Sequence, residues 1–323
     1  MLLHLAHETH YQYSPAVENA HHVVHLQPSS SATQTVISHH LVIDPPPDQH
    51  RESRDSYGNS RTFFSLHRSH GELRVSARSV VQTLARAPNS PSSTMPWEAV
   101  RDRFSYRAGS AYDAAWQFVF ASPLVARHSE FVDFALPSFT PTRPVAEAAH
   151  DLMTRLYRAM TFDDGATDVN TPPLEALRLG KGVCQDFAHI MVACCRALGL
   201  PARYVSGYLL TQPEPGQPRL VGCDASHAWA SVFCPDGFDS GQLATGKAPE
   251  QIGGQWLDFD PTNNRVPLDD YITLATGRDY LDVCPLRGVI HGGAQHTLSV
   301  AVTVTPADCT LDTAGVVLPV PLH

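Results

Sequence analysis

The segment from residue 184 to residue 198 is the clearest helix in the sequence, and it constrains the fold more than any other feature. Its apolar residues repeat at helical spacing and form one stripe. Gly199 and Pro201 follow it, as is typical where a helix ends. Strand-like runs come next, at 203–210, 227–233 and 256–259. This order predicts a region that combines helices with strands.

The first 85 residues have a different pattern, which is typical of β structure. Short runs rich in β-branched and aromatic residues alternate with turn signals, and the runs lie at 11–13, 23–26, 36–43, 62–66 and 73–81. Strands at this spacing favour a sandwich or a barrel. The predicted organisation is a β-rich, sandwich-like domain over 1–85, a Pro- and Ser-containing linker over 86–110, a core over 111–275 and a β extension of unassigned role over 276–323.

Composition argues against several classes of protein. The chain has 323 residues, of which 43 % are hydrophobic and 17 % charged, so it can bury a core. Its net charge is -9 and no basic stretch stands out, so we expect no nucleic-acid partner. No apolar run reaches the roughly 18 to 20 residues of a membrane helix. The N-terminus lacks the pattern of a secretory signal, and no CxxC pair is present, so we expect a reducing, cytoplasmic location without membrane attachment.

Cys184 lies where a glycine-rich turn, Gly180-Lys181-Gly182, meets the start of the clear helix. The N-terminus of a helix offers free N–H groups and a partial positive charge, and both favour a thiolate. The same N–H groups can receive the oxyanion of a tetrahedral intermediate. Position alone explains Cys184 equally well as a small residue that begins a helix.

Two further residue types fit an arrangement of nucleophile, base and acid. His227 lies at the start of a predicted strand, and histidine is the natural base for a cysteine nucleophile. An acid at the end of the 256–259 run would fix the tautomer of His227 and stabilise its imidazolium. Asp258 and Asp260 have the same parity along that strand, so parity does not choose between them.

Taken together, three segments closely resemble the bacterial transglutaminase-like superfamily. They are Gly182-Val183-Cys184-Gln185-Asp186-Phe187-Ala188-His189, Ser226-His227-Ala228-Trp229 and Phe259-Asp260-Pro261-Thr262-Asn263. The resemblance places the nucleophile on Cys184, the base on His227 and the orienting acid on Asp260 rather than Asp258. It implies an α+β fold, in which a β-rich N-terminal domain precedes a papain-like transglutaminase core. In that core the nucleophile lies at the N-terminus of a helix packed on an antiparallel sheet.

The resemblance extends over the chain to about residue 275. The N-terminal residues that look like the β-rich region of bacterial members are Tyr11, Tyr13, Leu26-Gln27-Pro28, Gln34, Asp55, Gly58 and Asn59. The segment Phe162-Asp163-Asp164-Gly165-Ala166-Thr167, followed by Thr171-Pro172, resembles the approach to the nucleophile. Asp164 departs from the family's pattern, in which we expect a proline.

The family implies a cysteine peptidase, an amidase or a transglutaminase-like acyltransferase that acts on a peptide or protein substrate. Cys184 would attack a carboxamide or peptide carbonyl to form a thioester, and His227 would protonate the leaving nitrogen and then activate the acceptor. Water as acceptor gives hydrolysis and an amine gives crosslinking. We favour hydrolysis because water is always available. The competing interpretation is a non-catalytic binding protein that keeps the fold.

Gln185 and Trp229 are the candidates for substrate contact. Gln185 either donates a hydrogen bond toward the oxyanion or caps the start of the helix. Trp229 has the same strand parity as His227, and it either forms one side of the site or packs in the core. Histidine pairs such as His21-His22, and others including His7, lack HExxH or CxxC spacing. We therefore expect scattered surface histidines and no metal. Without a P-loop or a GxGxxG motif, we expect no nucleotide cofactor.

Overall fold

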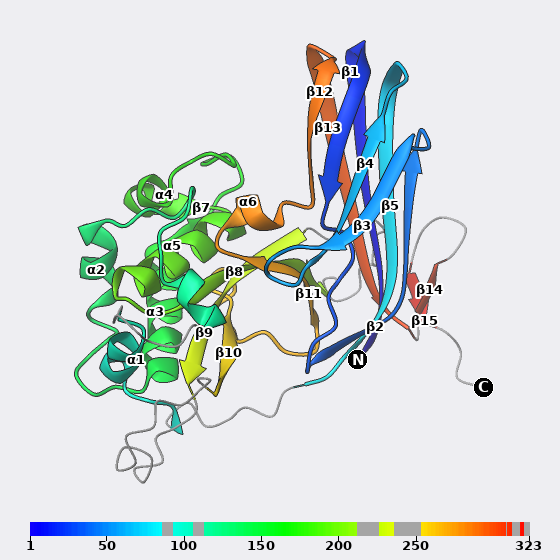
Figure 1. Ribbon diagram of the computed structural model, residues 1–323. Coiled ribbons are helices and arrows are strands. Elements are labelled where there is room, and N and C mark those ends of the chain that lie inside the picture. The colour runs from blue at the N-terminus through cyan, green and yellow to red at the C-terminus, as the bar shows by residue number, and fades with distance from the viewer. Residues whose placement is uncertain are drawn as a thin grey trace.

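The computed structural model describes residues 1–85, 93–105, 113–211, 226–235, 253–307, 309–311 and 317–319. It contains a larger and a smaller antiparallel sheet, and helices α1 to α5 gather on the side of the smaller sheet that faces away from the larger one (Figure 1). The helices are α1 (Trp97–Arg103), the 3-10 helix η2 (Ala114–Phe118), α2 (Ser129–Ala135), α3 (Val145–Ala159), α4 (Pro173–Leu179), α5 (Cys184–Ala197) and α6 (Tyr280–Val283).

The long strand β1 organises the larger sheet. Its first part pairs with β5 and β13, and its last part pairs with β4 and β12. The strands are β1 (Leu2–Val24), β2 (Gln34–Asp44), β3 (Gln49–Arg54), β4 (Ser60–Leu66), β5 (His70–Thr83), β12 (Leu286–Gly292) and β13 (Gln295–Pro306). Buried and more exposed side chains alternate along the first part of β1, so one face of the sheet carries the core.

The larger sheet differs from the sequence prediction in several places, and its strand β3 was not predicted. The run predicted at 11–13 and the first half of the run predicted at 23–26 belong to one continuous strand, β1, which ends at Val24, and β5 begins at His70, before the run predicted at 73–81. The strands β12 and β13, from the predicted C-terminal extension, complete the N-terminal sheet. Local sequence pattern cannot show this, because the partner of β13 lies almost the whole chain away. Helix α1 falls inside the predicted linker, of which 86–92 and 106–110 lie outside the described residues.

The smaller sheet has the strand order β10-β9-β8-β11, with every pairing antiparallel. Its strands are β8 (Ala202–Leu209), β9 (Ser226–Pro235), β10 (Gly254–Phe259) and β11 (Tyr271–Gly277). The predicted strands at 203–210, 227–233 and 256–259 correspond to β8, β9 and β10, whereas β11 was not predicted. The apolar stripe of α5, including Ile190, Met191 and Cys194, packs with Ala230 and Val232 of β9 in one buried cluster.

Two short pairings complete the described structure. β6 (Thr161–Phe162) runs parallel to β7 (Lys181–Gly182), and β14 (Cys309–Leu311) pairs with β15 (Val317–Pro319). The long loop predicted between β9 and β10 falls largely on residues 236–252, outside the described residues. Within the described residues, every helix is too short or too polar to span a bilayer.

Two side-chain amides attach the larger sheet to β11, which is an edge strand of the smaller sheet. Gln34 donates from Nε2 to the carbonyl of Thr273 at 2.7 Å and accepts at Oε1 from the N–H of Thr273 at 2.8 Å. Asn59 makes the same pair of bonds with Thr276, both at 2.8 Å. Each amide therefore supplies the two hydrogen bonds that a neighbouring strand would otherwise make. These are two of the residues that look like the family's N-terminal region.

Candidate active site

The local sequence fixes the start of α5, where Cys184 is the first helical residue. Oδ2 of Asp186 accepts hydrogen bonds from the N–H of Val183 at 2.8 Å and from the hydroxyl of Thr167 at 2.6 Å. A Cβ atom on Gly182 would lie 2.5 Å from that oxygen, so this close approach requires glycine. The N–H of Asp186 bonds the carbonyl of Val183 at 2.9 Å, whereas the N–H groups of Cys184 and Gln185, at the first two helical positions, have no acceptor within the helix.

His227 of β9 and Asp260, which follows β10, form the polar centre of the site. Nε2 of His227 lies 2.7 Å from Oδ2 of Asp260, whose side chain is fully buried. Oδ2 also accepts from the hydroxyl of Tyr271 at 2.7 Å and from Nδ2 of Asn263 at 2.8 Å. Oδ1 accepts from the backbone N–H groups of Thr262, at 2.9 Å, and Asn263, at 3.3 Å. Several donors converging on one carboxylate stabilise its ionised form.

The electrostatics of the site favour a charged His227–Asp260 pair. Burial lowers the pKa of His227, but hydrogen bonds and negative charge from Asp260 and Cys184 raise it by more, to about 10. Burial raises the pKa of Asp260, yet the hydrogen bonds from His227, Asn263 and Tyr271 bring it below its ordinary value. Because Nε2 of His227 is used by Asp260, Nδ1 is the ring nitrogen left to bond Cys184.

Cys184 is half-buried beside an aromatic wall. It packs against a small cluster that includes Tyr204, Ala228 and Tyr280. His189 lies one helical turn further along α5, is buried, and accepts a hydrogen bond from the N–H of Tyr280 at 3.1 Å. Its ring lies 4.7 Å from that of Tyr204. His189 therefore supports the wall of the site.

The structure brings Cys184, His227 and Asp260 together from α5, β9 and the turn after β10. Asp258, the alternative acid, does not bond His227 but lines a cavity elsewhere. Gln185 donates from Nε2 to the carbonyl of Val169 at 3.1 Å.

Trp229 is fully buried beside the same histidine. Its ring lies 5.3 Å from the ring of Tyr271 and 6.2 Å from that of His227. Substrate contact by Gln185 and Trp229 stays a prediction.

Two residues of the site were missed by sequence reasoning. Asn263 lies in one of the segments that resemble the family, but the sequence pattern does not show that its amide bonds Asp260. Tyr271 begins the run Tyr-Ile-Thr-Leu-Ala-Thr, whose β-branched and apolar residues are typical of a strand. Even a correct strand there would not have shown that the Tyr271 hydroxyl reaches Asp260, because that contact depends on tertiary structure.

The histidines do not assemble with other metal-ligating groups in the part of the chain that the structure describes, where no set of three or more was found. The expectation that they lie on the surface is wrong for His7 and His22, which are 2 % and 4 % exposed. His7 lies at the seam between the two sheets, with Nδ1 2.8 Å from the hydroxyl of Tyr208. Burial lowers the pKa of both histidines to about 4, so both are neutral near pH 7.

Comparisons with known proteins agree with this architecture. Residues 3–82 match the bacterial transglutaminase-like N-terminal region, and residues 132–261 match the transglutaminase-like superfamily. An uncharacterized protein of Mycobacterium tuberculosis is 38 % identical over 307 residues, which cover 94 % of this chain and 92 % of the relative. One of Mycobacterium leprae is 31 % identical over 309 residues, covering 93 % and 97 %.

A solved structure shows the same fold. The crystal structure of a proposed cysteine protease from Cytophaga hutchinsonii superposes with a TM-score of 0.69 and 20 % sequence identity, over 97 % of this chain and 92 % of that chain. The fold is therefore α+β, with a curled β-rich sheet attached to a papain-like core. The chain belongs to the transglutaminase-like superfamily, and its core is preceded by the N-terminal region found in bacterial members.

Proposed function

We propose that this chain is a cysteine enzyme that transfers acyl groups from peptide or glutamine amides. In this proposal Cys184 is the nucleophile, His227 the general acid and base, and Asp260 the residue that orients His227. The observation that carries it is the continuous contact from Cys184 through His227 to the fully buried Asp260. A base held by a buried acid beside a thiol is the arrangement that nucleophilic cysteine chemistry requires.

The first half of the reaction forms a thioester. The Cys184 proton resides on His227, so the Cys184 thiolate attacks the amide carbonyl carbon, and the backbone N–H of Cys184 at the start of α5 stabilises the oxyanion. The C–N bond then breaks as Nδ1 of the protonated His227 gives its proton to the leaving nitrogen. Asp260 holds the imidazolium through Nε2 and keeps Nδ1 directed at the reacting atoms.

The second half releases the acyl group. His227, now neutral, takes a proton from the acceptor as it attacks the thioester carbon, and the Cys184 sulfur leaves. We propose water as the acceptor, which makes the reaction a hydrolysis of a peptide or protein substrate. An amine in its place would give crosslinking. The described cysteine side chains, Cys184, Cys194, Cys195, Cys234 and Cys284, are free thiols, which supports a reducing, cytoplasmic setting.

Product masses test this proposal directly. Wild-type protein and a Cys184→Ala variant are incubated with a peptide mixture, with and without a primary amine, and the products are analysed by mass spectrometry. Hydrolysis gives cleaved or deamidated peptides in both conditions, whereas acyl transfer gives adducts only with the amine. The proposal fails if wild-type protein forms no product beyond those of the Cys184→Ala protein, because every step depends on that thiol.

A further inference from the structure

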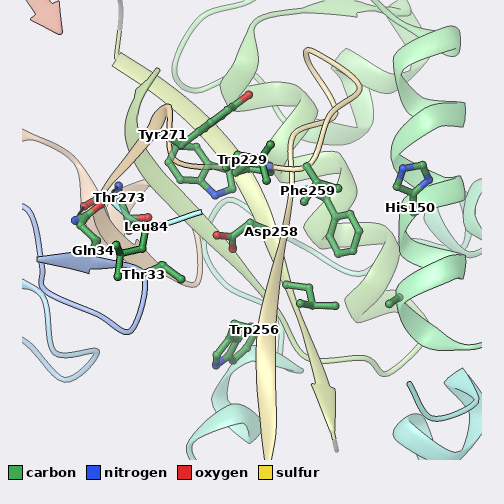
Figure 2. Close-up of a pocket in the computed structure, with 15 residues that line it drawn as sticks. Thr33, Gln34, Leu84, His150, Trp229, Trp256, Asp258, Phe259, Tyr271 and Thr273 are labelled. Carbon is green, nitrogen blue, oxygen red and sulfur yellow. Dashed lines mark hydrogen bonds between the residues drawn. The ribbon is translucent and has the colours of Figure 1, made fainter. Parts of the chain in front are cut away.

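A cavity of about 170 Å3 lies beside edge strand β10, at the junction of the two sheets (Figure 2). Residues of α3, β9, β10 and β11 line it from the core, and Thr33, Gln34 and Leu84 line it from the larger sheet. Of the described residues that line it, none is Cys184 or His227. The cavity wall therefore contains neither the thiol nor the histidine of the candidate site.

Most of the cavity wall is apolar. Trp256, Phe259 and Tyr271 contribute aromatic surface. Three aliphatic residues of the lining are also open to solvent: Leu84 is 54 % exposed, Val266 43 % and Leu268 49 %. A hollow that is apolar inside and opens among exposed aliphatic side chains is typical of a site for a small apolar group.

Trp229, which lines this cavity, carries a buried hydrogen-bond donor without a partner. Its side chain is fully buried, and its Nε1–H has no hydrogen-bond partner. In Figure 2 the nitrogen edge of the indole is turned to the side on which Asp258 lies. A buried donor without a partner is unfavourable, so an acceptor atom placed here would be stabilising. The cavity therefore favours a ligand that carries an oxygen acceptor.

The carboxylate of Asp258 determines which ligand charge is favourable in the cavity. It is the one Asp, Glu, Lys or Arg residue among the described lining residues. Arg203 and Asp258 attract each other electrostatically, and the Arg203 guanidinium lies 4.3 Å from the ring centre of Trp256. An anionic ligand would be repelled by the Asp258 carboxylate, and the described lining residues include no Lys or Arg that would offset the repulsion. A cationic ligand would compete with Arg203 for Asp258. A neutral ligand avoids both costs, and a carboxylate can accept further N–H bonds beside its existing partners.

We propose that this cavity binds a neutral apolar group that carries an amide, as a leucine-like residue within a peptide does. The amide carbonyl accepts from Nε1–H of Trp229, the amide N–H donates to Asp258, and the aliphatic part packs against Leu84 and Leu268. Binding here does not require the chemistry at Cys184. An effect of the ligand on turnover does rest on the proposed function, and it would act through Trp229 and Tyr271, which contact His227 and Asp260.

Nuclear magnetic resonance of the tryptophan indole groups tests this binding without reference to activity. The Cys184→Ala protein, labelled with 15N at tryptophan, is titrated with N-acetyl-L-leucinamide, and the Trp229 signal is assigned by its loss in Trp229→Phe. We expect the Trp229 indole proton to shift downfield as it gains an acceptor. The anion N-acetyl-L-leucine should bind about tenfold more weakly, because it faces Asp258. Absence of a Trp229 shift, or equal binding of the anion, overturns the proposal.

Two exposed leucines provide a matched pair of variants. Leu84→Trp places bulk in the mouth of the cavity and should weaken binding about tenfold or more. Leu298→Trp on β13 changes a leucine of nearly equal exposure, 52 % against 54 %, away from the cavity and should leave binding unchanged. Equal binding in both variants contradicts the assignment. Binding without Cys184-dependent turnover would contradict only the proposed function, and turnover without binding would contradict only the cavity site.

Discussion

The hydroxyl of Tyr271 donates to Oδ2 of Asp260 at 2.7 Å, the same oxygen that Nε2 of His227 approaches at 2.7 Å. Tyr271 is the first residue of β11, and Gln34 of the larger sheet bonds both backbone groups of Thr273, two residues further on. A chain of hydrogen bonds and one short stretch of strand therefore link the N-terminal sheet to the acid of the candidate site. The larger sheet is part of the structure that holds the site.

Removing the hydroxyl of Tyr271 should lower activity. We expect Tyr271→Phe to reduce kcat/KM about tenfold, because Asp260 loses a donor and is held less firmly behind His227. Tyr208→Phe is the matched control, since the hydroxyl of Tyr208 is also buried in the smaller sheet but bonds His7 instead. Steady-state rates on a peptide identified by mass spectrometry check this. Similar losses in the two variants would show a general effect on stability rather than on Asp260.

The two candidate acids can be separated by isosteric replacement. Asp260→Asn removes the negative charge that fixes and stabilises the His227 imidazolium, so we expect turnover to fall by about two orders of magnitude or more. Asp258→Asn should keep most of the turnover, because Asp258 lines the cavity and does not bond His227. The assignment is contradicted if Asp258→Asn is the more damaging of the two.

The candidate site shows what a sequence can and cannot predict. Cys184 and the start of α5 were predictable because local signals, the glycine-rich turn and the apolar stripe, determine them. The choice between Asp258 and Asp260 was not available from parity, since the two residues have the same parity in the sequence. Tyr271 was missed because its contact with Asp260 joins the start of β11 to the end of β10, which are opposite edge strands of the smaller sheet, and no local pattern encodes such a tertiary contact.

The same limit applies to the larger sheet. Alternation predicted most of its strands, but β12 and β13 are added to β1 from the opposite end of the chain. Gln34 and Asn59 stood out only by resemblance. Their physical role became clear from their bonds to the edge of β11, which the sequence did not identify as a strand.

Gln34 offers a test of how the two sheets are joined. Its buried amide makes three hydrogen bonds, to Ser29 and to both backbone groups of Thr273. Gln34→Ala leaves those groups unpaired, and we expect the free energy of unfolding to fall by about 3 kcal/mol, measured by urea denaturation. Gln82→Ala on β5 is the control, because the Gln82 amide bonds the carbonyls of Met1, at an exposed position, and of Thr83. Equal midpoints for the two variants would contradict a structural role for the Gln34 amide.

The raised pKa of His227 predicts a pH dependence of stability. Its pKa is about 10 in the folded chain against an ordinary value of 6.5, so the protonated form stabilises the folded state. This contribution is fully present below pH 6.5 and is lost as the pH rises toward about 10. The difference in unfolding free energy between wild type and His227→Ala should therefore shrink over that range. Urea denaturation at several pH values measures it, and a constant difference would contradict the raised pKa.

The rate at which Cys184 reacts with a thiol-directed electrophile tests the central claim most directly. Wild-type protein and His227→Ala are treated with iodoacetamide near neutral pH, and labelling is followed residue by residue by peptide mapping. Cys284 serves as the internal reference, because it is also a half-buried free thiol but bonds Tyr280 and Leu286. A Cys184 thiolate stabilised by the His227 imidazolium predicts that Cys184 reacts faster than Cys284 in wild type, and that His227→Ala loses most of the Cys184 labelling while that of Cys284 is unchanged. Equal labelling of Cys184 in the two folded proteins would contradict an activated thiolate.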